Sequence, residues 1–259
     1  MNILVVGRGW VGMKVFNELL ERGHVVSLVR HENAISAVER SFSVFDWVVN
    51  CAGITGTPNV DGCEKQKAET HLANAVFPVE LFKACQVSDM KFAHFSSGCI
   101  YEGNISDVNA DPNYFGSTYS VSKGISDLIL KENSLVFRVR LPFSGERVSK
   151  NLFTKLEKYA LNGKLVEGGL NSITDIDEAV RVACDLMEEG ASGPYNLVNS
   201  GAVTTHEIAE ILELNPNWYT AEEFRAVTAA ARSNCTIPDS GRMRSVREAL
   251  IEAAAKFRS

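Results

Sequence analysis

Long apolar runs are absent from this sequence of 259 residues. It holds no stretch of about 18 consecutive apolar residues, so it predicts no membrane-spanning helix. Residues 2–6 (NILVV) are typical of a strand that begins at once, which leaves no room for a positively charged leader. We therefore expect a cytoplasmic protein that does not bind a membrane.

Paired cysteines and clustered histidines are also absent. No CxxC pair occurs and the His residues number five, while the cysteines lie far apart at Cys51, Cys63, Cys85, Cys99, Cys184 and Cys235. This pattern indicates neither a disulfide framework nor a metal site, and it is typical of a reducing compartment.

Dense basic clusters are missing as well. The 26 basic residues are outnumbered by 32 acidic ones, for a net charge of −6, and no group of Lys and Arg could follow a phosphate backbone. Nucleic acid is therefore not expected as a partner. With 45% apolar and 22% charged residues and no repeat, the chain should form a packed globule of one large domain, with room for a smaller lobe.

The first half of the chain alternates short apolar runs with helical periodicity. This spacing predicts an α/β fold, a Rossmann-type doubly wound parallel sheet with crossover helices. Gly23 ends the first helix. Strands are expected at 3–6, 25–29, 47–49, 92–96 and 136–141, and a further helix at 120–131.

The pattern changes after Pro142, and we place a boundary near residue 145. Residues 1–145 are expected to form the sheet domain, with 177–198 returning to it, and residues 146–259 a smaller C-terminal substrate lobe. Helices are expected at 151–161, 177–189, 206–212 and 246–257, and a short strand at 195–198.

A glycine-rich segment lies between the first predicted strand and helix. Its residues Gly7, Arg8, Gly9, Trp10, Val11 and Gly12 match G-x-G-x-x-G. Glycines there permit a tight turn and close approach to a pyrophosphate, which the helix N-terminus attracts. The segment predicts dinucleotide binding. The alternative is a tight strand–helix turn that happens to use three glycines.

Arginine stands where an NAD enzyme usually carries an acid for the ribose hydroxyls. Arg30 ends the second predicted strand, and a guanidinium is matched to the 2′-phosphate of NADPH. Arg8 and His31 could join this pocket. We therefore favour NADPH over NADH, although Glu32 lies nearby and these side chains could face water instead.

Tyr119 and Lys123 form Y-x-x-x-K on a predicted helix, so both side chains leave one face of it. Ser97 follows a predicted strand 22 residues upstream. The spacing alone is weak evidence, since an exposed Tyr and a solvated Lys would give it too. With the glycine segment, these residues resemble the extended short-chain dehydrogenase/reductase family.

That resemblance implies a role for each residue. Tyr119 protonates a carbonyl oxygen as NADPH delivers hydride, Ser97 hydrogen-bonds the same oxygen, and Lys123 holds the nicotinamide ribose and lowers the pKa of Tyr119. Ala52 and Gly53 would line the cofactor.

A narrower resemblance spans nearly the whole chain. It is to the bifunctional UDP-4-keto-6-deoxyglucose 3,5-epimerase/4-reductases that form the C-terminal part of plant rhamnose synthases. It implies a UDP-linked sugar substrate, UDP-β-L-rhamnose as product, no metal, and a possible homodimer. The matching segments are Asn50–Glu64, Phe95–Glu102, Gly116–Lys123, Arg138–Pro142, Asn151–Lys155 and Arg232–Asn234.

The same resemblance assigns the epimerase step to Cys99, two positions after Ser97. C3 and C5 of the sugar both flank the C4 ketone, so one polarised carbonyl acidifies both C–H bonds, and a thiol can act as the base. Lys155 is the candidate proton donor on the opposite face. The alternatives are a buried structural thiol and a surface or phosphate-binding lysine.

The matched segments also imply substrate contacts. Arg232 would meet the diphosphate, and Asn74 would steady the active-site backbone unless it is a plain surface residue. Thr55, Asn59 and Asn151 would line the sugar or base site, or serve as turn formers, and Asn234, beside Arg232 in its matched segment, would also bind the substrate. Two other functions remain open: a reductase without epimerase activity, and a non-catalytic NADP-binding regulatory subunit.

Overall fold

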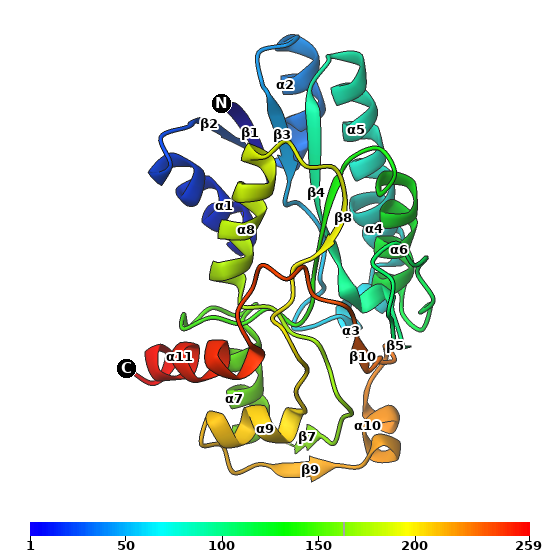
Figure 1. Cartoon of the computed structure of the whole chain (residues 1–259). Coiled ribbons are helices and arrows are strands. Elements are labelled where there is room, and N and C mark those ends of the chain that lie inside the picture. Colours follow the sequence, from blue (N-terminus) through cyan, green and yellow to red (C-terminus); the bar gives the residue numbers. More distant parts are fainter. Residues whose placement is uncertain (163) are drawn as a thin grey trace.

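A parallel sheet of six strands forms the centre of the computed structural model, which describes residues 1–162 and 164–259. The strand order is β2-β1-β3-β4-β6-β8 (Figure 1). The bounds are β1 (Asn2–Val6), β2 (Val25–Val29), β3 (Trp47–Asn50), β4 (Lys91–Ser97), β6 (Leu135–Val139) and β8 (Gly193–Asn196). Central strands such as β3 are buried along their whole length, as expected when helices cover both faces.

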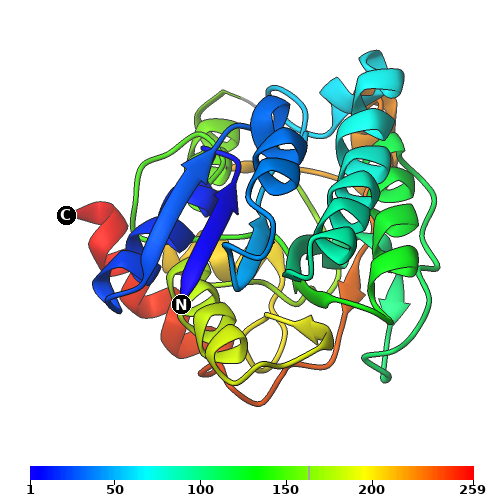
Figure 2. The same ribbon diagram turned by 90° about the horizontal axis from the view of Figure 1, so that it is seen from above.

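Helices pack on both faces of the sheet, as Figure 2 shows from above. Ile3 and Val5 of β1 share a core with α1 (Trp10–Glu21) and α8 (Ile176–Glu188). The alternate residues Leu4 and Val6 share a second core with the other face, which is covered by α2 (Ala34–Arg40), α5 (Phe77–Val87) and α6 (Thr118–Leu130). The predicted Rossmann-type architecture is confirmed.

The strand order reverses between β1 and β3. The chain turns from β1 through α1 to β2 on one side, whereas β3 has β4 on its other side. The connections from β1 and β3 therefore run to opposite sides of the sheet, and at such a switch point ligands usually bind in a crevice outside the carboxyl ends of the strands. Short elements follow β3: α3 (Asp61–Lys65), α4 (Lys67–His71) and a π-helical turn (Leu72–Val76).

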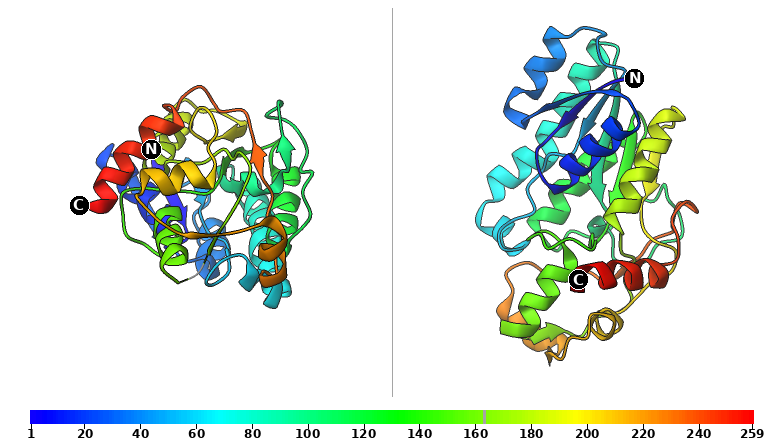
Figure 3. Two further views of the ribbon diagram at one scale, coloured as in Figure 1. Left: turned by 90° about the horizontal axis from the view of Figure 1, so that it is seen from below. Right: turned by 90° about the vertical axis from the view of Figure 1, so that its left-hand side faces the viewer.

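A smaller lobe lies beyond the carboxyl ends of the strands (Figure 1, and Figure 3 on the right). It has its own core, in which Phe143, Phe153 and Phe257 pack together. Two short sheets pair β7 with β9 and β10 with β5. Its elements are α7 (Leu152–Asn162), β7 (Lys164–Val166), α9 (Thr205–Ile211), β9 (Asn217–Tyr219), α10 (Ala221–Val227), β10 (Cys235–Thr236) and α11 (Val246–Arg258), while β5 (Gly103–Asn104) precedes α6.

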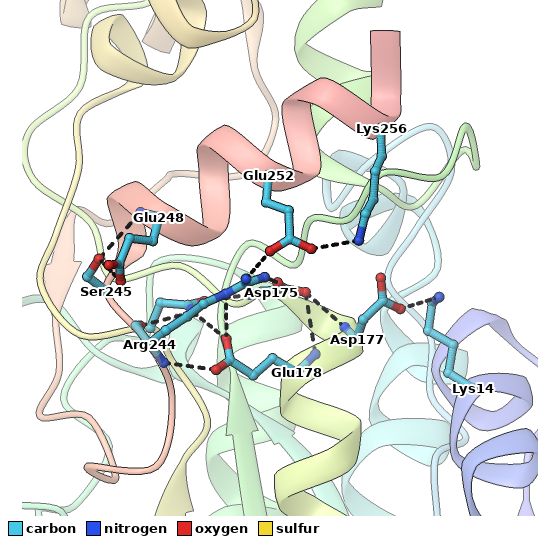
Figure 4. A network of polar contacts seen from close by, with 10 residues as sticks. Lys14, Asp175, Asp177, Glu178, Arg244, Ser245, Glu248, Glu252 and Lys256 are labelled. Carbon is cyan, nitrogen blue, oxygen red and sulfur yellow. Dashed lines mark hydrogen bonds and ion pairs between the residues drawn. The ribbon is translucent and has the colours of Figure 1, made fainter. Parts of the chain in front are cut away.

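Charged side chains tie α11 to α8 and α8 to α1 (Figure 4). Arg244 bonds the buried Asp175 at 2.8 Å and also pairs with Glu178 and Glu252. The Asp175 carboxylate accepts bonds from the first amides of α8, so it caps that helix as well. Lys14 of α1 pairs with Asp177. These contacts fix the three helices relative to one another.

Element ends differ from expectation at a few places. The helix predicted at 177–189 begins at Ile176, after the Asp175 cap. The strand predicted to reach residue 141 ends at Val139, because Leu141 takes a positive φ of 44° that a strand cannot contain. Within the described residues, no helix has the length and apolar character needed to cross a membrane.

Candidate active site

The glycine segment closes tightly on the end of β3. Gly7 has φ 105°, and a Cβ there would lie 2.8 Å from the Ala52 nitrogen. A Cβ at Gly12 would lie 2.0 Å from the Gly7 carbonyl oxygen. At Gly9, by contrast, a Cβ would meet no heavy atom within 4 Å. Packing therefore requires glycine at Gly7 and Gly12, whereas the backbone at Gly9 is open to a ligand.

The N-terminus of α1 faces this opening. Gly9 is its N-cap, with no side-chain cap bond and no acidic residue in the first turn. Trp10 and Val11 begin the helix, and the Trp10 indole donates to Glu146 at 2.8 Å. Free amides and the helix dipole suit a pyrophosphate. The residues present therefore fit a dinucleotide cofactor.

Two exposed guanidinium groups follow the ends of β1 and β2. Arg8 and Arg30 are both exposed, and Arg8 donates weakly to the Leu28 carbonyl oxygen at 3.4 Å. The part of the chain that the structure describes offers neither of them a carboxylate partner. His31, in contrast, lies 3.3 Å from Glu32. Both arginines are therefore free to bind a phosphate.

The chain after β3 runs over buried polar groups. A Cβ on Gly53 would lie 2.9 Å from Asn74 Oδ1 and 3.3 Å from Lys123 Nζ. Asn74 sits in the π-helical turn and bonds both the nitrogen and the carbonyl oxygen of Ile54, at 2.8 and 2.9 Å. Ala52 donates its amide to Asn50 Oδ1. Asn74 thus fixes the backbone beside the crevice, the role implied by the resemblance rather than that of a plain surface residue.

The start of α6 is held by two caps. The Ser117 hydroxyl accepts from the Ser120 amide at 3.1 Å. Glu64, on α3, accepts from the Thr118 amide and hydroxyl at 2.7 and 2.8 Å. Tyr119 is therefore placed in the first turn of a helix that is anchored to the loop after β3. The sequence patterns did not reveal this role of Glu64.

Ser97, Tyr119 and Lys123 meet at the end of β4. The Ser97 side chain hydrogen-bonds Tyr119 and also accepts from the Cys99 amide at 3.1 Å. Lys123 is buried, and its ammonium donates to the Phe95 carbonyl oxygen at 3.0 Å. The structure thus brings the three residues together.

Burial has the largest effect on the pKa values of Tyr119 and Lys123. It raises the pKa of Tyr119, which the nearby Cys99 raises further, and the hydrogen bond from Ser97 opposes this only in part. Burial lowers the pKa of Lys123 to about 8, against the favourable charge of Asp127. The ammonium implied to lower the pKa of Tyr119 is directed at Phe95, and the pKa of Tyr119 lies above its usual value.

Cys99 and Lys155 approach the cluster from different lobes. Cys99 lies half-buried on the turn after β4, and Lys155 half-buried on α7. Burial lowers the pKa of Lys155, as do the charges of Lys150 and Arg232, while Cys99 raises it. The thiol, the amine and the two further cations therefore lie within electrostatic range of one another.

Contacts between the lobes line the mouth of the site. Lys150 donates to the Thr55 hydroxyl at 2.8 Å, and Asn59 donates to the Tyr159 hydroxyl at 2.8 Å. Arg232 pairs with Asp61 at 3.0 Å and reaches Asn59 at 3.4 Å. The structure thus brings Thr55, Asn59 and Arg232 close together. Lys150 and Tyr159 lie outside the matching segments, and Asp61 lies inside one of them without an assigned role.

Two predicted substrate residues hydrogen-bond other parts of the chain. Asn151 is fully buried, and its amide group bonds Ser144, Glu146 and Phe153. Asn234 accepts from Asn171 at 3.0 Å and packs against Gly169. Asn151 thus holds its own turn, which is the alternative that the sequence left open, whereas Asn234 is exposed and its side chain is bonded, among the described residues, only through Oδ1.

The glycines give a matched pair of variants. Gly12→Ala should lower the free energy of unfolding by about 2 kcal/mol or more, because the new methyl overlaps the Gly7 carbonyl. Gly9→Ala should leave the melting temperature nearly unchanged but weaken NADPH binding about tenfold, since its methyl enters open space. Thermal melts and fluorescence titration measure both. Equal NADPH affinity for Gly9→Ala and wild type would show that no pyrophosphate lies there.

The buried Lys123 should lower the free energy of unfolding at neutral pH. The pKa of Lys123 is about 8 in the folded chain, against 10.5 for a free lysine. The folded chain therefore holds the charged form less well than the unfolded chain, which lowers the free energy of unfolding at all pH values below 8. This loss of stability disappears as the pH rises from 8 to 10.5. Lys123→Met should therefore unfold in urea with about 2 kcal/mol more stability than wild type at pH 7, with no gain left at pH 10.5.

Lys131→Met is the matched control. Lys131 is also buried, but it pairs with Asp111 at 2.6 Å, so its removal should destabilise the chain at pH 7. A Lys123→Met chain no more stable than wild type at pH 7 would show that its ammonium is well accommodated.

Comparison with known proteins identifies relatives along nearly the whole chain. A trifunctional UDP-glucose 4,6-dehydratase/UDP-4-keto-6-deoxy-D-glucose 3,5-epimerase/UDP-4-keto-L-rhamnose-reductase of Arabidopsis thaliana is 34% identical over 205 residues, 72% of this chain and 30% of that protein. A bifunctional dTDP-4-dehydrorhamnose 3,5-epimerase/dTDP-4-dehydrorhamnose reductase of the same plant is 32% identical over 256 residues, 90% of this chain and 83% of that protein. The chain thus spans about a third of the trifunctional relatives it matches.

Solved structures agree with the fold. The UDP-rhamnose synthase of Acanthamoeba polyphaga mimivirus superposes with a TM-score of 0.90 at 26% identity, covering 99% of both chains. The dTDP-4-dehydrorhamnose reductase of Bacillus anthracis, solved with NADP, superposes with a TM-score of 0.82 at 18% identity, covering 98% of this chain and 99% of that one. The RmlD substrate binding domain matches residues 1–250. The chain therefore belongs to the RmlD substrate binding domain family, within the extended short-chain dehydrogenase/reductases.

Proposed function

We propose that the chain is a nucleotide-sugar 4-ketoreductase of rhamnose synthesis, and that it is bifunctional. It would use NADPH, epimerise UDP-4-keto-6-deoxy-D-glucose at C3 and C5, and reduce C4 to give UDP-β-L-rhamnose. The observation that carries the proposal is the meeting of Ser97, Tyr119 and Cys99 with Lys155 across the crevice. The names of the Arabidopsis relatives pair the same two activities.

The reductase half rests on Tyr119 and Ser97. A phenol whose pKa lies above its usual value is fully protonated at neutral pH, so Tyr119 holds on its Oη the proton that a carbonyl oxygen needs. Ser97 would hydrogen-bond the same oxygen. NADPH, when bound, would supply hydride to C4. Lys123, with its pKa near 8, would bind the ribose hydroxyls below Gly53 and can exchange a proton near neutral pH.

The choice of NADPH rests on the two exposed arginines. Arg8 lies within the glycine segment and Arg30 directly follows β2; both would bind the 2′-phosphate of NADPH, because a guanidinium binds phosphate oxygens in a bidentate manner. The Bacillus anthracis reductase, which shares the fold, was solved with NADP. Residues 1–145, with 177–198, would form the cofactor part, and 146–259 the sugar-nucleotide part.

The epimerase half rests on Cys99 and Lys155. The Cys99 sulfur would take the proton as a C3–H or C5–H bond breaks, and the electron pair would pass to the ketone oxygen, held by Ser97 and Tyr119. Lys155 would return a proton to the opposite face of the same carbon. Burial and neighbouring cations lower the pKa of Lys155, which eases that transfer at neutral pH.

Positively charged side chains at the mouth of the site would bind the diphosphate of the substrate. Lys150, Lys155 and Arg232 influence one another there, and three cations suit two phosphates. Asn59 and Thr55 lie beside them. Uridine is the proposed base because the mimivirus synthase and the trifunctional Arabidopsis protein carry UDP in their names.

An assay of the wild-type chain and Cys99→Ala tests both halves. With UDP-4-keto-6-deoxyglucose in D₂O, wild type should consume NADPH, seen at 340 nm, and incorporate deuterium at C3 and C5. Cys99→Ala should lose deuterium incorporation at both carbons by about 100-fold or more, because no base remains. It should still reduce an already epimerised 4-keto sugar.

Cys85→Ala is the control, since Cys85 is buried in the sheet core far from the crevice. Unchanged deuterium incorporation in Cys99→Ala would leave a reductase without this base. No loss of absorbance at 340 nm with UDP, dTDP or GDP sugars would instead favour a non-catalytic NADP-binding subunit.

We also propose a homodimer. Ile125, Leu128 and Ile129 of α6 are 42–49% exposed, and Leu72 and Val76 stand exposed on the neighbouring helical run. Two copies of this face can cover each other about a two-fold axis. Sedimentation velocity should give a dimer for wild type and a monomer for Leu128→Glu; a monomeric wild type would contradict the proposal.

A further inference from the structure

Arg140 is a buried cation directly behind the active-site turn. It follows β6 and is 2% exposed. Its guanidinium donates to the Gly98 carbonyl oxygen at 3.2 Å, to the Ser233 carbonyl oxygen at 2.8 Å and to Asn171 Oδ1 at 2.6 Å. Its Nε atom is buried without a partner among residues 1–162 and 164–259. All its acceptors are neutral.

The neighbouring Arg138 shows what a structural arginine looks like in this chain. It is also buried, but Asp127 bonds it at 2.6 and 2.9 Å and neutralises its charge. Within the described part of the chain no carboxylate pairs with Arg140. A guanidinium buried without a counter-charge is costly, and an apolar side chain would fill the same space at less cost. Its presence therefore calls for a role beyond packing.

The two carbonyls bound by Arg140 belong to the two halves of the site. Gly98 lies between Ser97 and Cys99, and Ser233 lies next to Arg232. A Cβ on Gly98 would lie 3.1 Å from the Arg140 Cβ, so the Cys99 turn rests directly on this side chain. Arg140 thus joins the turn after β4 to the segment that reaches the substrate mouth.

The charge of Arg140 also acts on groups that sense Cys99. Burial raises the pKa of Cys235 to about 11, and there Arg140 opposes the rise while Cys99 adds to it. Burial also raises the pKa of Tyr114, and there too Arg140 lowers the pKa while Cys99 raises it. Both charges therefore act over one small volume. The other charged or titratable groups around that volume are Tyr119, Lys155, Glu102 and Arg232.

We propose that Arg140 is a positioning residue for epimerisation, which holds the Cys99 turn against the Arg232–Asn234 segment and whose unneutralised positive charge lies directly behind that turn, where epimerisation creates negative charge. The proposal rests on the proposed function, in which Cys99 is the base. The positive field would equally favour the enolate that forms when a C–H bond breaks. Reduction at C4, which needs the proton of Tyr119 rather than a thiolate, should depend on Arg140 much less.

Three variants separate charge from shape. Arg140→Lys keeps the charge, Arg140→Gln removes it, and Asn171→Asp places a carboxylate at the 2.6 Å contact and so neutralises the guanidinium in place. Asn171→Ser, like Asn171→Asp, loses the bonds that the amide nitrogen donates to Gly169 and Asn234; it also loses the Oδ1 contacts, and it adds no charge. Arg138→Lys is the control for changing a buried arginine. Circular dichroism and thermal melts establish which variants fold.

The first readout is the rate at which iodoacetamide alkylates Cys99 at pH 7.5, followed by mass spectrometry of its peptide. Alkylation consumes the thiolate, so the rate should fall about fivefold or more in Arg140→Gln and Asn171→Asp. Arg140→Lys, Asn171→Ser and Arg138→Lys should stay within about twofold of wild type. A purely structural role would not produce this division by charge.

The second readout compares two reactions in the same variants. Deuterium incorporation at C3 and C5 should fall about tenfold in Arg140→Gln, while reduction of the epimerised 4-keto sugar falls less than about threefold. Equal alkylation in all folded variants would overturn the inference. If Arg140→Gln does not fold, the pair Asn171→Asp and Asn171→Ser decides. If wild type incorporates no deuterium, the proposed function fails, and alkylation still tests Arg140 separately.

Discussion

The close approach of the β1 turn to the end of β3 is the constraint on which the rest of the site depends. The Gly7 backbone packs against Ala52, and Gly12 against the Gly7 carbonyl, at separations that admit no side chain. This contact sets α1 with its N-terminus toward the crevice and places Gly53 over Asn74 and Lys123. The glycine segment and the buried polar residues Asn74 and Lys123 therefore depend on the same backbone geometry.

The chemistry of the site comes from both lobes. Tyr119 and Ser97 lie on the sheet domain, where helix caps and strand ends fix them, whereas Lys155 arrives on α7 of the smaller lobe. Cys99 sits at the boundary, on a turn that Arg140 supports from behind. A reduction can proceed on the first set alone, but an inversion needs groups on two faces of the sugar. In the proposed reaction, the two lobes would supply the groups on these two faces.

Local patterns made much of this predictable, because their geometry is set within a few residues. The glycine segment is defined by one turn, and Tyr119 and Lys123 share a face because they lie four positions apart on a helix. Long-range partners left no such pattern. Glu64 caps α6 from 54 positions away, and Lys150 reaches Thr55 across 95. Each becomes visible only when the chain is folded.

Asparagine was the least predictable residue type. Asn74 and Asn151 are both given roles by the resemblance and both are fully buried, yet Asn74 bonds the backbone of Ile54 and Asn151 its own turn. An amide side chain suits either task equally, so its neighbours decide. The same reason explains Arg138 and Arg140, two positions apart in one motif, of which Asp127 neutralises only the first.

The ion pairs of Figure 4 have a mechanical consequence. They join α1, α8 and α11 through several carboxylates shared with Arg244 and Lys14. The mouth of the crevice is bridged by hydrogen bonds from Lys150 to Thr55 and from Asn59 to Tyr159, and by the ion pair of Arg232 with Asp61. A hinge axis along the charged junction of Figure 4 would let the mouth widen by breaking only these contacts. Entry of a bulky sugar nucleotide would then leave the helix that carries Tyr119 undisturbed.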